Sequence, residues 1–451
     1  MSSITGTNQV KGSDLPLTGT RVIDLTHIVA GPFCAAILAD FGADVIKVEQ
    51  PGRGDRARAV APFIERGEAR VSGFFATMNR NRRGVALDLK SAPGKEVFRK
   101  LVGVSDVLIE NFSAGTMDRL GLGYEVLRQL NPRLVYVAIS GFGQLEPYIG
   151  PWSSRQANNA PVQAMSGFMD QSGDPDGPPG LTGHSIGDTI PGLWAALATL
   201  LALECRRKTG LGQFLDVALY DSMASMCFNA IADYHVTGTP PHRGLPWPVT
   251  FTTRLRCADG YIAVSLWGIM KDGWQRLLHL IGRPDMLTHP EFDLAHPGCP
   301  RCYTIMKPIL EEWLAGVTRE DAVRMLLDLG FSAGPVYSVK EVYESEQLRK
   351  RQAFIEIEDG LGGTIRTIGT PVKFSGLRLP SPRRAPFLGE HTAEVLAEVL
   401  GLTPAELDRL GMSGDPSSPQ PTDLPAPRTH TATRRRGAQP RVRKRPGGLQ
   451  R

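Results

Sequence analysis

Asp188 is the residue in this chain best placed to do chemistry. It lies in a segment of small residues, Gly183-His-Ser-Ile-Gly-Asp-Thr-Ile-Pro-Gly192, just before the apolar run Leu193–Leu203. That run predicts a buried helix with the carboxylate at or near its N-terminus. An aspartate there commonly serves as the N-cap. In an active site the same group can act as a nucleophile toward an activated acyl group, and the rest of the chain must decide between these two interpretations.

Two further groups of residues are weaker candidates for chemistry. His184 precedes the aspartate by four residues and is interpreted as a loop histidine. Cys299 and Cys302 form a single Cys-x-x-Cys pair, and without a second pair the spacing is weak evidence for zinc or redox chemistry. The six cysteines are scattered over the chain, which favours reduced thiols and a cytoplasmic location over a disulfide framework.

The charge of the chain is concentrated in one segment. The 451 residues carry a formal net charge of +5, and 41% of them are hydrophobic, enough for a sizeable core. Residues 411–451 contain nine Lys and Arg against Asp415 and Asp423, a net +7 that leaves −2 for the rest. The body is therefore nearly neutral, and the basic segment, rich in Pro, Ser, Thr and Arg, is expected to be disordered.

Nucleic-acid binding through that basic segment is an alternative of another class. Its clusters Arg434–Arg436 and Arg441–Arg445 could contact phosphates. The segment has no aromatic residue to stack on bases, and the body shows no nucleic-acid motif. We therefore expect no nucleic-acid partner. We also expect no membrane partner, because the N-terminus lacks a secretory pattern and the apolar run is too short to span a bilayer.

Alternating strand and helix patterns run through the first part of the chain and must position these residues. Six β-rich runs precede or separate helical stretches, and they lie at 21–25, 44–49, 84–89, 106–110, 134–139 and 210–219. Strands separated by helices of this length predict an α/β fold with a Rossmann-like parallel sheet. The loop 26–32 lacks Gly-x-Gly-x-x-Gly, which argues against a nicotinamide or flavin cofactor.

Composition divides the chain into five parts. We expect a flexible N-terminus at 1–15, a large domain at 16–230, and a linker with a smaller α+β domain at 231–335. The chain then returns to the large domain at 336–410 and ends in the basic tail at 411–451. The Pro- and Gly-rich stretch 237–248 marks the linker between the large domain and the smaller domain.

Short segments spread over residues 16–410 resemble family III CoA-transferases, the group that includes formyl-CoA:oxalate and carnitine CoA-transferases. Three of them are Phe41-Gly-Ala-Asp-Val-Ile-Lys-Val-Glu49, Asn79-Arg-Asn-Arg-Arg-Gly-Val-Ala-Leu-Asp-Leu-Lys90 and Lys208-Thr-Gly-Leu-Gly-Gln-Phe-Leu-Asp-Val217. Others lie at 22–33, 110–121, 139–143, 163–167 and 388–392. The resemblance rests on their joint order and spacing.

The resemblance implies transfer of CoA from an acyl-CoA to a free carboxylic acid, with CoA thioesters as substrates and no permanently bound cofactor. The family's nucleophilic aspartate falls on Asp188, which would form an anhydride and then an aspartyl-CoA thioester. Backbone N–H groups at the helix start are expected to keep this carboxylate ionised. Family members are interlocked homodimers, so a homodimer is expected here.

The resemblance also implies a set of CoA-binding positions. His27, Ile28, Val29 and Ala30 fall on the loop expected over the pantetheine and the active site. The positions expected at the adenine and phosphate end are Leu87, Lys90, Asn111, Phe112 and Arg119. Lys90 and Arg119 suit the phosphates as cations, whereas Leu87 and Phe112 could equally be core residues.

Some positions depart from the formyl-CoA:oxalate pattern. Gln50 stands for an arginine, Val29 stands for a glutamine, and a glycine-rich loop near 240–260 is missing, which argues against oxalate as the acid. A racemase of α-methylacyl-CoA thioesters is the alternative enzyme. Its catalytic His-Asp pair would fall on Asn158 and Asn159, and an amide cannot abstract an α-proton at neutral pH.

Overall fold

A six-stranded parallel sheet forms the centre of the larger part of the molecule. The computed structural model describes residues 15–245 and 247–412. The sheet has the order β5-β2-β1-β6-β7-β8, and every neighbouring pair is parallel. Its strands are β1 (Arg21–Asp24), β2 (Asp44–Glu49), β5 (Arg82–Ala86), β6 (Val107–Glu110), β7 (Val135–Ser140) and β8 (Phe214–Ala218). The predicted α/β fold with a parallel sheet is confirmed.

Helices cover both faces of this sheet, because its buried strands are apolar on both sides. On one face α1 (Ala30–Asp40) and α8 (Ile186–Thr209) pack against residues such as Val22 and Val137. On the other face α3 (Ala92–Gly103) and α5 (Tyr124–Leu130) pack against residues such as Ile23 and Tyr136. Successive residues of β1 thus point into opposite cores, as the alternation of side chains along a strand requires.

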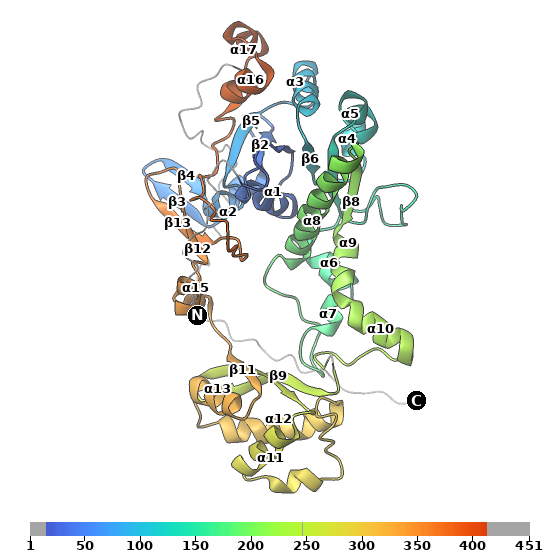
Figure 1. The fold of residues 1–451 in the computed structure, drawn as a ribbon, viewed down its shortest axis with the longest axis vertical. Coiled ribbons are helices and arrows are strands. Elements are labelled where there is room, and N and C mark those ends of the chain that lie inside the picture. The colour runs from blue at the N-terminus through green and yellow to red at the C-terminus, as the bar shows by residue number, and fades with distance from the viewer. Residues whose placement is uncertain (1–14, 246, 413–451) are drawn as a thin grey trace, which may run out of the picture.

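A smaller body has its own sheet and its own core. Its antiparallel sheet has the order β11-β10-β9, formed by β9 (Thr250–Cys257), β10 (Gly260–Trp267) and β11 (Ser332–Pro335). Its three longer helices are α11 (Lys271–Leu280), α12 (Pro300–Leu314) and α13 (Arg319–Asp328). The core around Trp274 draws only on residues between 245 and 333. In Figure 1 this body lies below the large sheet and is joined to it by two separate stretches of chain.

After the smaller body the chain returns to the large sheet. Helix α16 (Thr392–Leu400) packs on the edge strand β5, where the N–H of His391 donates to the carbonyl oxygen of Gly84 at 2.8 Å. The capping box of Thr403 then starts α17 (Pro404–Leu410), which lies beside α16 in Figure 1. Two antiparallel hairpins complete the sheets, β3 (Phe63–Arg66) with β4 (Ala69–Ser72) and β12 (Phe354–Glu358) with β13 (Thr364–Ile368).

Short helices connect the longer elements. The α-helices among them are α2 (Gly73–Met78), α4 (Thr116–Arg119), α6 (Asn159–Met165), α7 (Phe168–Gln171), α9 (Leu219–Ala224), α10 (Phe228–Thr237), α14 (Val339–Tyr343) and α15 (Glu346–Lys350). Three are 3₁₀ turns, η2 (Arg56–Ala59), η3 (Ser225–Cys227) and η4 (Pro284–Thr288).

Helix α8 is longer than the apolar run indicated. It extends over 24 residues and ends at Gly210, which adopts the left-handed conformation typical of a helix end. Within the described residues it is the one helix with the length and apolar composition to cross a bilayer, so the expectation of an apolar run too short for this was wrong. The helix is also less buried than expected, since only 39% of its most apolar 18-residue stretch is buried.

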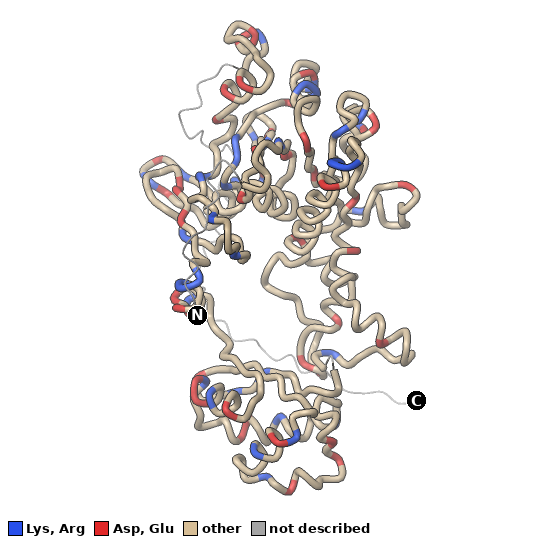
Figure 2. Tube along the Cα trace, viewed as in Figure 1, with Lys and Arg blue, Asp and Glu red and all other residues tan. Residues whose placement is uncertain are grey.

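Acidic and basic residues are interspersed along the described chain, as Figure 2 shows for both bodies. This agrees with the near-neutral charge inferred for the body. The basic clusters at 434–436 and 441–445 lie outside the described residues, as does the N-terminal segment 1–14.

Candidate active site

The site lies where the strand order of the sheet reverses. Strand β1 has β2 on one side and β6 on the other, and the loops after β1 and β6 diverge from the sheet at the carboxyl ends of the strands. Open α/β sheets bind ligands at such a point. The two loops are tied together, because the His27 N–H donates to Asn111 Oδ1 at 2.9 Å and Asn111 Nδ2 donates to the His27 carbonyl oxygen at 2.9 Å.

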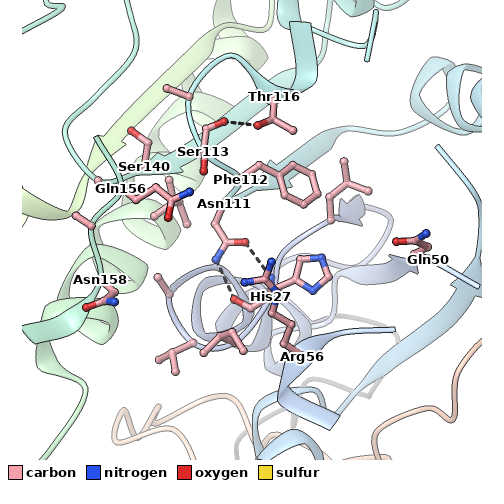
Figure 3. A pocket seen from close by; sticks show the side chains of 18 of the residues that line it. His27, Gln50, Arg56, Asn111, Phe112, Ser113, Thr116, Ser140, Gln156 and Asn158 are labelled. Carbon is pink, nitrogen blue, oxygen red and sulfur yellow. Dashed lines mark hydrogen bonds between the residues drawn. The ribbon is translucent and has the colours of Figure 1, made fainter. Parts of the chain in front are cut away.

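A cavity of about 780 Å³ opens at this position. Nine of the ten residues predicted for the site line it, namely His27, Ile28, Val29, Ala30, Leu87, Lys90, Asn111, Phe112 and Asp188. Figure 3 shows His27, Asn111 and Phe112 in the middle of the view, and the two rings are 5.8 Å apart between centroids. Leu87 is only 1% exposed, so it serves both as a core residue and as part of the cavity floor.

Arg119 does not line the cavity. Its guanidinium donates to Thr116 Oγ1 at 2.8 Å and to the Ala114 carbonyl oxygen at 3.4 Å, so it folds back along its own short helix. Thr116 and Ala114 line the cavity themselves. The structure therefore does not place Arg119 among the cavity residues with the other predicted CoA-binding positions, because its side chain holds the loop that carries Ala114 and Thr116.

Several cavity residues were missed from the sequence. Arg53 and Arg56 follow β2, and Gln156 and Asn158 come from the loop before α6, on the opposite side of the view in Figure 3 from Gln50. The signal for the two arginines was present, since they follow the carboxyl end of a parallel strand next to β1. Arg155 also lines the cavity, and no strand or motif marked it.

A buried ion network supports the loop after β1. The Lys47 ammonium lies 3.0 Å from Asp55 Oδ2 and donates to the Thr26 carbonyl oxygen at 2.7 Å, and both charged side chains are fully buried. Asp55 Oδ1 accepts the N–H of Ile28 at 3.1 Å. Burial alone would raise the pKa of Asp55, but the Lys47 charge and the contacts with His27 and the Ala57 N–H together outweigh it and hold that pKa well below its usual range.

The loop that this ion network supports has an unusual backbone conformation. Ile28 has a φ of +68°, in the left-handed region that a β-branched residue rarely adopts. Such a conformation persists only where the surroundings fix it. The hydrogen bond from Ile28 to Asp55 and the contact of Lys47 with Thr26 therefore hold the loop 26–29 in a shape that the sequence alone would not prefer.

Asp188 is the third residue of α8 and not its N-cap, which is Ser185. Two glycines bring it close to the loop after β1. A Cβ on Gly187 would lie 2.6 Å from the Asn159 carbonyl oxygen, and one on Gly192 would lie 2.5 Å from the Ala30 carbonyl oxygen. Close backbone contact at both positions thus seats the start of α8 against α6 and the start of α1.

The electrostatics of Asp188 differ from expectation. Burial raises its pKa to about 6. Among the described residues no backbone N–H donates to its carboxylate, so the expectation that helix N–H groups keep it ionised was wrong. With a pKa below 7 the group is still mainly a carboxylate at neutral pH, and a partly desolvated carboxylate is a stronger nucleophile than a solvated one.

The residues at the racemase positions have other tasks. Asn158 lines the cavity, and Asn159 Oδ1 accepts the N–H of Gly187 at 2.9 Å, which satisfies one of the free N–H groups at the start of α8. His184 lies in the exposed loop before α8 and is not among the cavity residues. Positions 158 and 159, where the resemblance places the base of that reaction, therefore carry amides and no histidine.

Comparisons with known proteins agree with this geometry. The family model described as CoA-transferase family III matches residues 17–392. The chain is 36% identical over 391 residues to a succinyl-CoA:mesaconate CoA-transferase of Haloarcula hispanica, covering 85% of this chain and 96% of that protein. It is 33% identical over 409 residues to a formyl-CoA:oxalate CoA-transferase of Escherichia coli O157:H7, covering 85% and 95%. A CAIB/BAIF family protein from Brucella suis has the same fold, with a TM-score of 0.74, 34% identity, and 85% and 99% coverage.

Proposed function

This chain belongs to CoA-transferase family III, an enzyme family that moves CoA between acids, and from that premise we propose that Asp188 is its nucleophile. The Asp188 carboxylate attacks the thioester carbonyl, the C–S bond breaks, and a mixed anhydride forms as CoA thiolate leaves. The thiolate attacks the aspartyl carbonyl, which releases the donor acid and leaves an aspartyl-CoA thioester. The acceptor carboxylate then attacks the aspartyl-CoA carbonyl, the C–S bond breaks, and a second anhydride forms as CoA thiolate leaves. The thiolate attacks the acyl carbon of the acceptor in this anhydride to give the new acyl-CoA and free Asp188.

One observation carries the proposal. Asp188 lines the same cavity as eight of the nine residues expected to bind CoA, and burial raises its pKa to about 6 without removing its charge at neutral pH. A cavity of about 780 Å³ is within the range of small-molecule sites, roughly 300–1,000 Å³. Its walls would shield an anhydride from water, which the reaction requires.

The CoA molecule would run along the loops after β1 and β6. We place the pantetheine along Ile28 and Val29, since both residues line the same cavity as Asp188. The cations Arg53, Arg56 and Lys90 also line the cavity, and they suit the diphosphate and the 3′-phosphate. We propose no contact of Arg119 with the phosphates, because its guanidinium contacts Thr116.

The acid substrate would lie near Gln156, Asn158 and Arg155, which all line the cavity, and Figure 3 shows the first two on the opposite side of the view from Gln50. The guanidinium of Arg155 lies 5.6 Å from the ring centre of Trp152 and can receive a carboxylate. The two curated relatives are named for mesaconate and oxalate, and we propose a small carboxylic acid of this kind here. Gln50 and Val29 argue against oxalate itself, so a screen of acyl-CoA donors against acids must identify the pair.

We also propose that the enzyme is a homodimer in the cytoplasm. One face of α8 exposes Leu193, Trp194, Leu197, Leu200 and Leu201, although the opposite face is buried in the core. A helix that is apolar all round is normally covered on all sides. Because Asp188 in its first turn lines a polar cavity, we assign the exposed face to a second copy of the chain and not to lipid.

Trapping the covalent intermediate tests the nucleophile. The enzyme is incubated with a donor acyl-CoA and hydroxylamine, which converts an activated carboxyl to a hydroxamate. We expect loss of activity only when donor is present, and a hydroxamate on the peptide that contains Asp188. A racemase passing through an enolate would be indifferent to the reagent, so α-deuterium exchange without a modified Asp188 peptide would overturn the proposal.

Asp188→Asn is the matched control for the trapping experiment. It should form no adduct and retain less than about a hundredth of the transfer activity, because an amide cannot form the anhydride. The folded pKa of Asp188 is raised, so its ionisation at neutral pH opposes folding. The variant should therefore melt at the same temperature as the native enzyme or higher, and a lower melting temperature would assign the lost activity to misfolding.

A further inference from the structure

Two cysteines begin a helix of the smaller body. Cys299 is the N-cap residue of α12, and its Sγ accepts the N–H of Cys302 at 3.3 Å. Residues three apart on one helical turn have Cα atoms about 5 Å apart. A disulfide needs about 4.4–6.8 Å between these atoms. The backbone of this turn therefore already has the spacing of a disulfide, although both thiols are free in the structure.

The two thiols differ in access. Cys299 is partly exposed, whereas Cys302 is 1% exposed and its Sγ accepts the N–H of Asp293 at 3.3 Å. Burial and the neighbouring Cys299 thiol together raise the pKa of Cys302 to about 12. Cys302 is thus a protonated, covered thiol, and a reagent from solvent can reach only Cys299.

A metal does not explain the pair. A structural zinc site needs four ligands, and within the described residues no group of three or more His, Cys, Asp or Glu side chains is arranged to hold a metal ion. The nearby His296 is already hydrogen-bonded to Asp293 Oδ2 at 2.7 Å. The remaining chemistry of two adjacent thiols is oxidation.

We propose that Cys299 and Cys302 form a reversible dithiol–disulfide site that exchanges with small-molecule disulfides. The Cys299 sulfur attacks one sulfur of the small disulfide, whose S–S bond breaks to release one thiol and leave a mixed disulfide on Cys299. Cys302 then attacks the Cys299 sulfur and displaces the second thiol. The protein loses two electrons and two protons, and the small disulfide gains both.

The site is separate from the transfer chemistry. No described residue after Leu219 is among the cavity residues, and the pair lies in the smaller body with α12 (Figure 1). Gly298, next to Cys299, donates its N–H to the Pro248 carbonyl oxygen at 2.8 Å, in the segment that leads into β9. Variants of the two cysteines are therefore expected to leave basal transfer unchanged.

Glutathione disulfide is the probe. The full-length enzyme carrying Cys205→Ser, which removes the exposed cysteine of α8, is equilibrated with defined ratios of glutathione and glutathione disulfide. Trypsin cleaves after Arg301, between the two cysteines, so an internal disulfide keeps both peptides joined until it is reduced. We expect this joined pair to form in the folded enzyme and to disappear on adding excess glutathione.

Single variants test the order of attack. Cys302→Ser should stop at one glutathione on Cys299, because the resolving thiol is missing. Cys299→Ser should take up none, because Cys302 is covered. Transfer activity and melting temperature are measured on both to show that they are folded. Equal glutathione uptake by the two variants, or no joined peptides in the native enzyme at excess glutathione disulfide, would overturn the proposal.

Discussion

Asp188 and Asp55 are two carboxyl groups near one cavity that the fold treats in opposite ways. Burial raises the pKa of Asp188 to about 6, since no cation or N–H among the described residues compensates for it. Asp55 lies deeper, but the Lys47 ammonium at 3.0 Å holds its pKa well below the usual range. Asp188 can therefore gain and lose its negative charge during a reaction. Asp55 stays ionised and holds the backbone of the loop after β1 in place.

The pKa of Asp188 predicts how the reaction depends on pH. Attack on the thioester needs the carboxylate, so kcat/KM for acyl-CoA should be flat at neutral pH. As the pH falls below about 6 it should decrease by about tenfold per unit, because the protonated fraction grows in that window. Initial rates between about pH 5 and 8 test this, with circular dichroism at each pH as the control for folding. A profile flat to about pH 5 contradicts the assignment.

Asp55→Asn should loosen the loop that carries Ile28. The amide still accepts one N–H, but it leaves the buried Lys47 without its nearest anion. Breaking a buried pair costs roughly 3–5 kcal/mol, and Ile28 is then free to leave its left-handed conformation. We expect a lower melting temperature and a KM for acyl-CoA raised by about tenfold or more.

A surface carboxylate provides the comparison for Asp55. Glu65 pairs with Arg70, but its side chain is 65% exposed, so Glu65→Gln should change neither the melting temperature nor KM. An unchanged KM in Asp55→Asn, despite a lower melting temperature, would show that the network stabilises the fold without shaping the CoA site.

At the scale of elements, the position of α8 depends on its contact with the start of α1. A Cβ at position 192 would lie 2.5 Å from the Ala30 carbonyl oxygen, so Gly192→Ala must push α8 away from the loop after β1. Because Asp188 lies one turn before this contact, we expect kcat to fall by about a hundredfold, the effect of a misplacement near 1 Å. Initial rates at saturating substrates measure it.

Gly183→Ala is the matched control, since a Cβ there meets no atom within 4 Å. It should keep both kcat and KM. A Gly192→Ala enzyme with native kcat would mean that the spacing between α8 and α1 does not position the nucleophile.

Sequence patterns predicted the elements that are strongly apolar. Asp44–Glu49 was predicted with its observed bounds, and the strand and helix boundaries around it were within two or three residues. The hairpin β3–β4 was missed because its residues are charged or half-exposed, as Glu65 and Arg70 illustrate, so little alternation marks it. The strand order, which ties His27 to Asn111, depends on long-range pairing that no local pattern carries.

The site was predictable only in part for the same reason. Resemblance supplied nine residues that line the cavity, but it could not show that the Arg119 guanidinium turns back on Thr116. Nor did the sequence show the burial that raises the pKa of Asp188, because the contacts of α8 with α6 and α1 are made by chain distant in sequence.

For the whole molecule, the exposed apolar faces predict a dimer that does not dissociate on dilution. Besides the five residues of α8, helix α10 exposes Phe228, Ile231 and Tyr234. Apolar patches of this extent mark interfaces, and the two bodies are joined by two separate stretches of chain around which a second chain could wrap (Figure 1). Light scattering at micromolar concentration should give twice the mass of the chain, and a fully active monomer contradicts the prediction.

The same assembly can be tested by placing charge on the proposed interface. Leu197→Glu with Leu201→Glu puts two carboxylates on the exposed face of α8, where both leucines are 44% and 62% exposed in the single chain. In a monomer these changes lie in water and cost little, whereas in a dimer they bury unpaired charges. We expect the double variant to lose the dimer and most of its activity. Leu130→Glu, at an equally exposed position on α5, should lose neither, and a fully dimeric double variant would place the interface elsewhere.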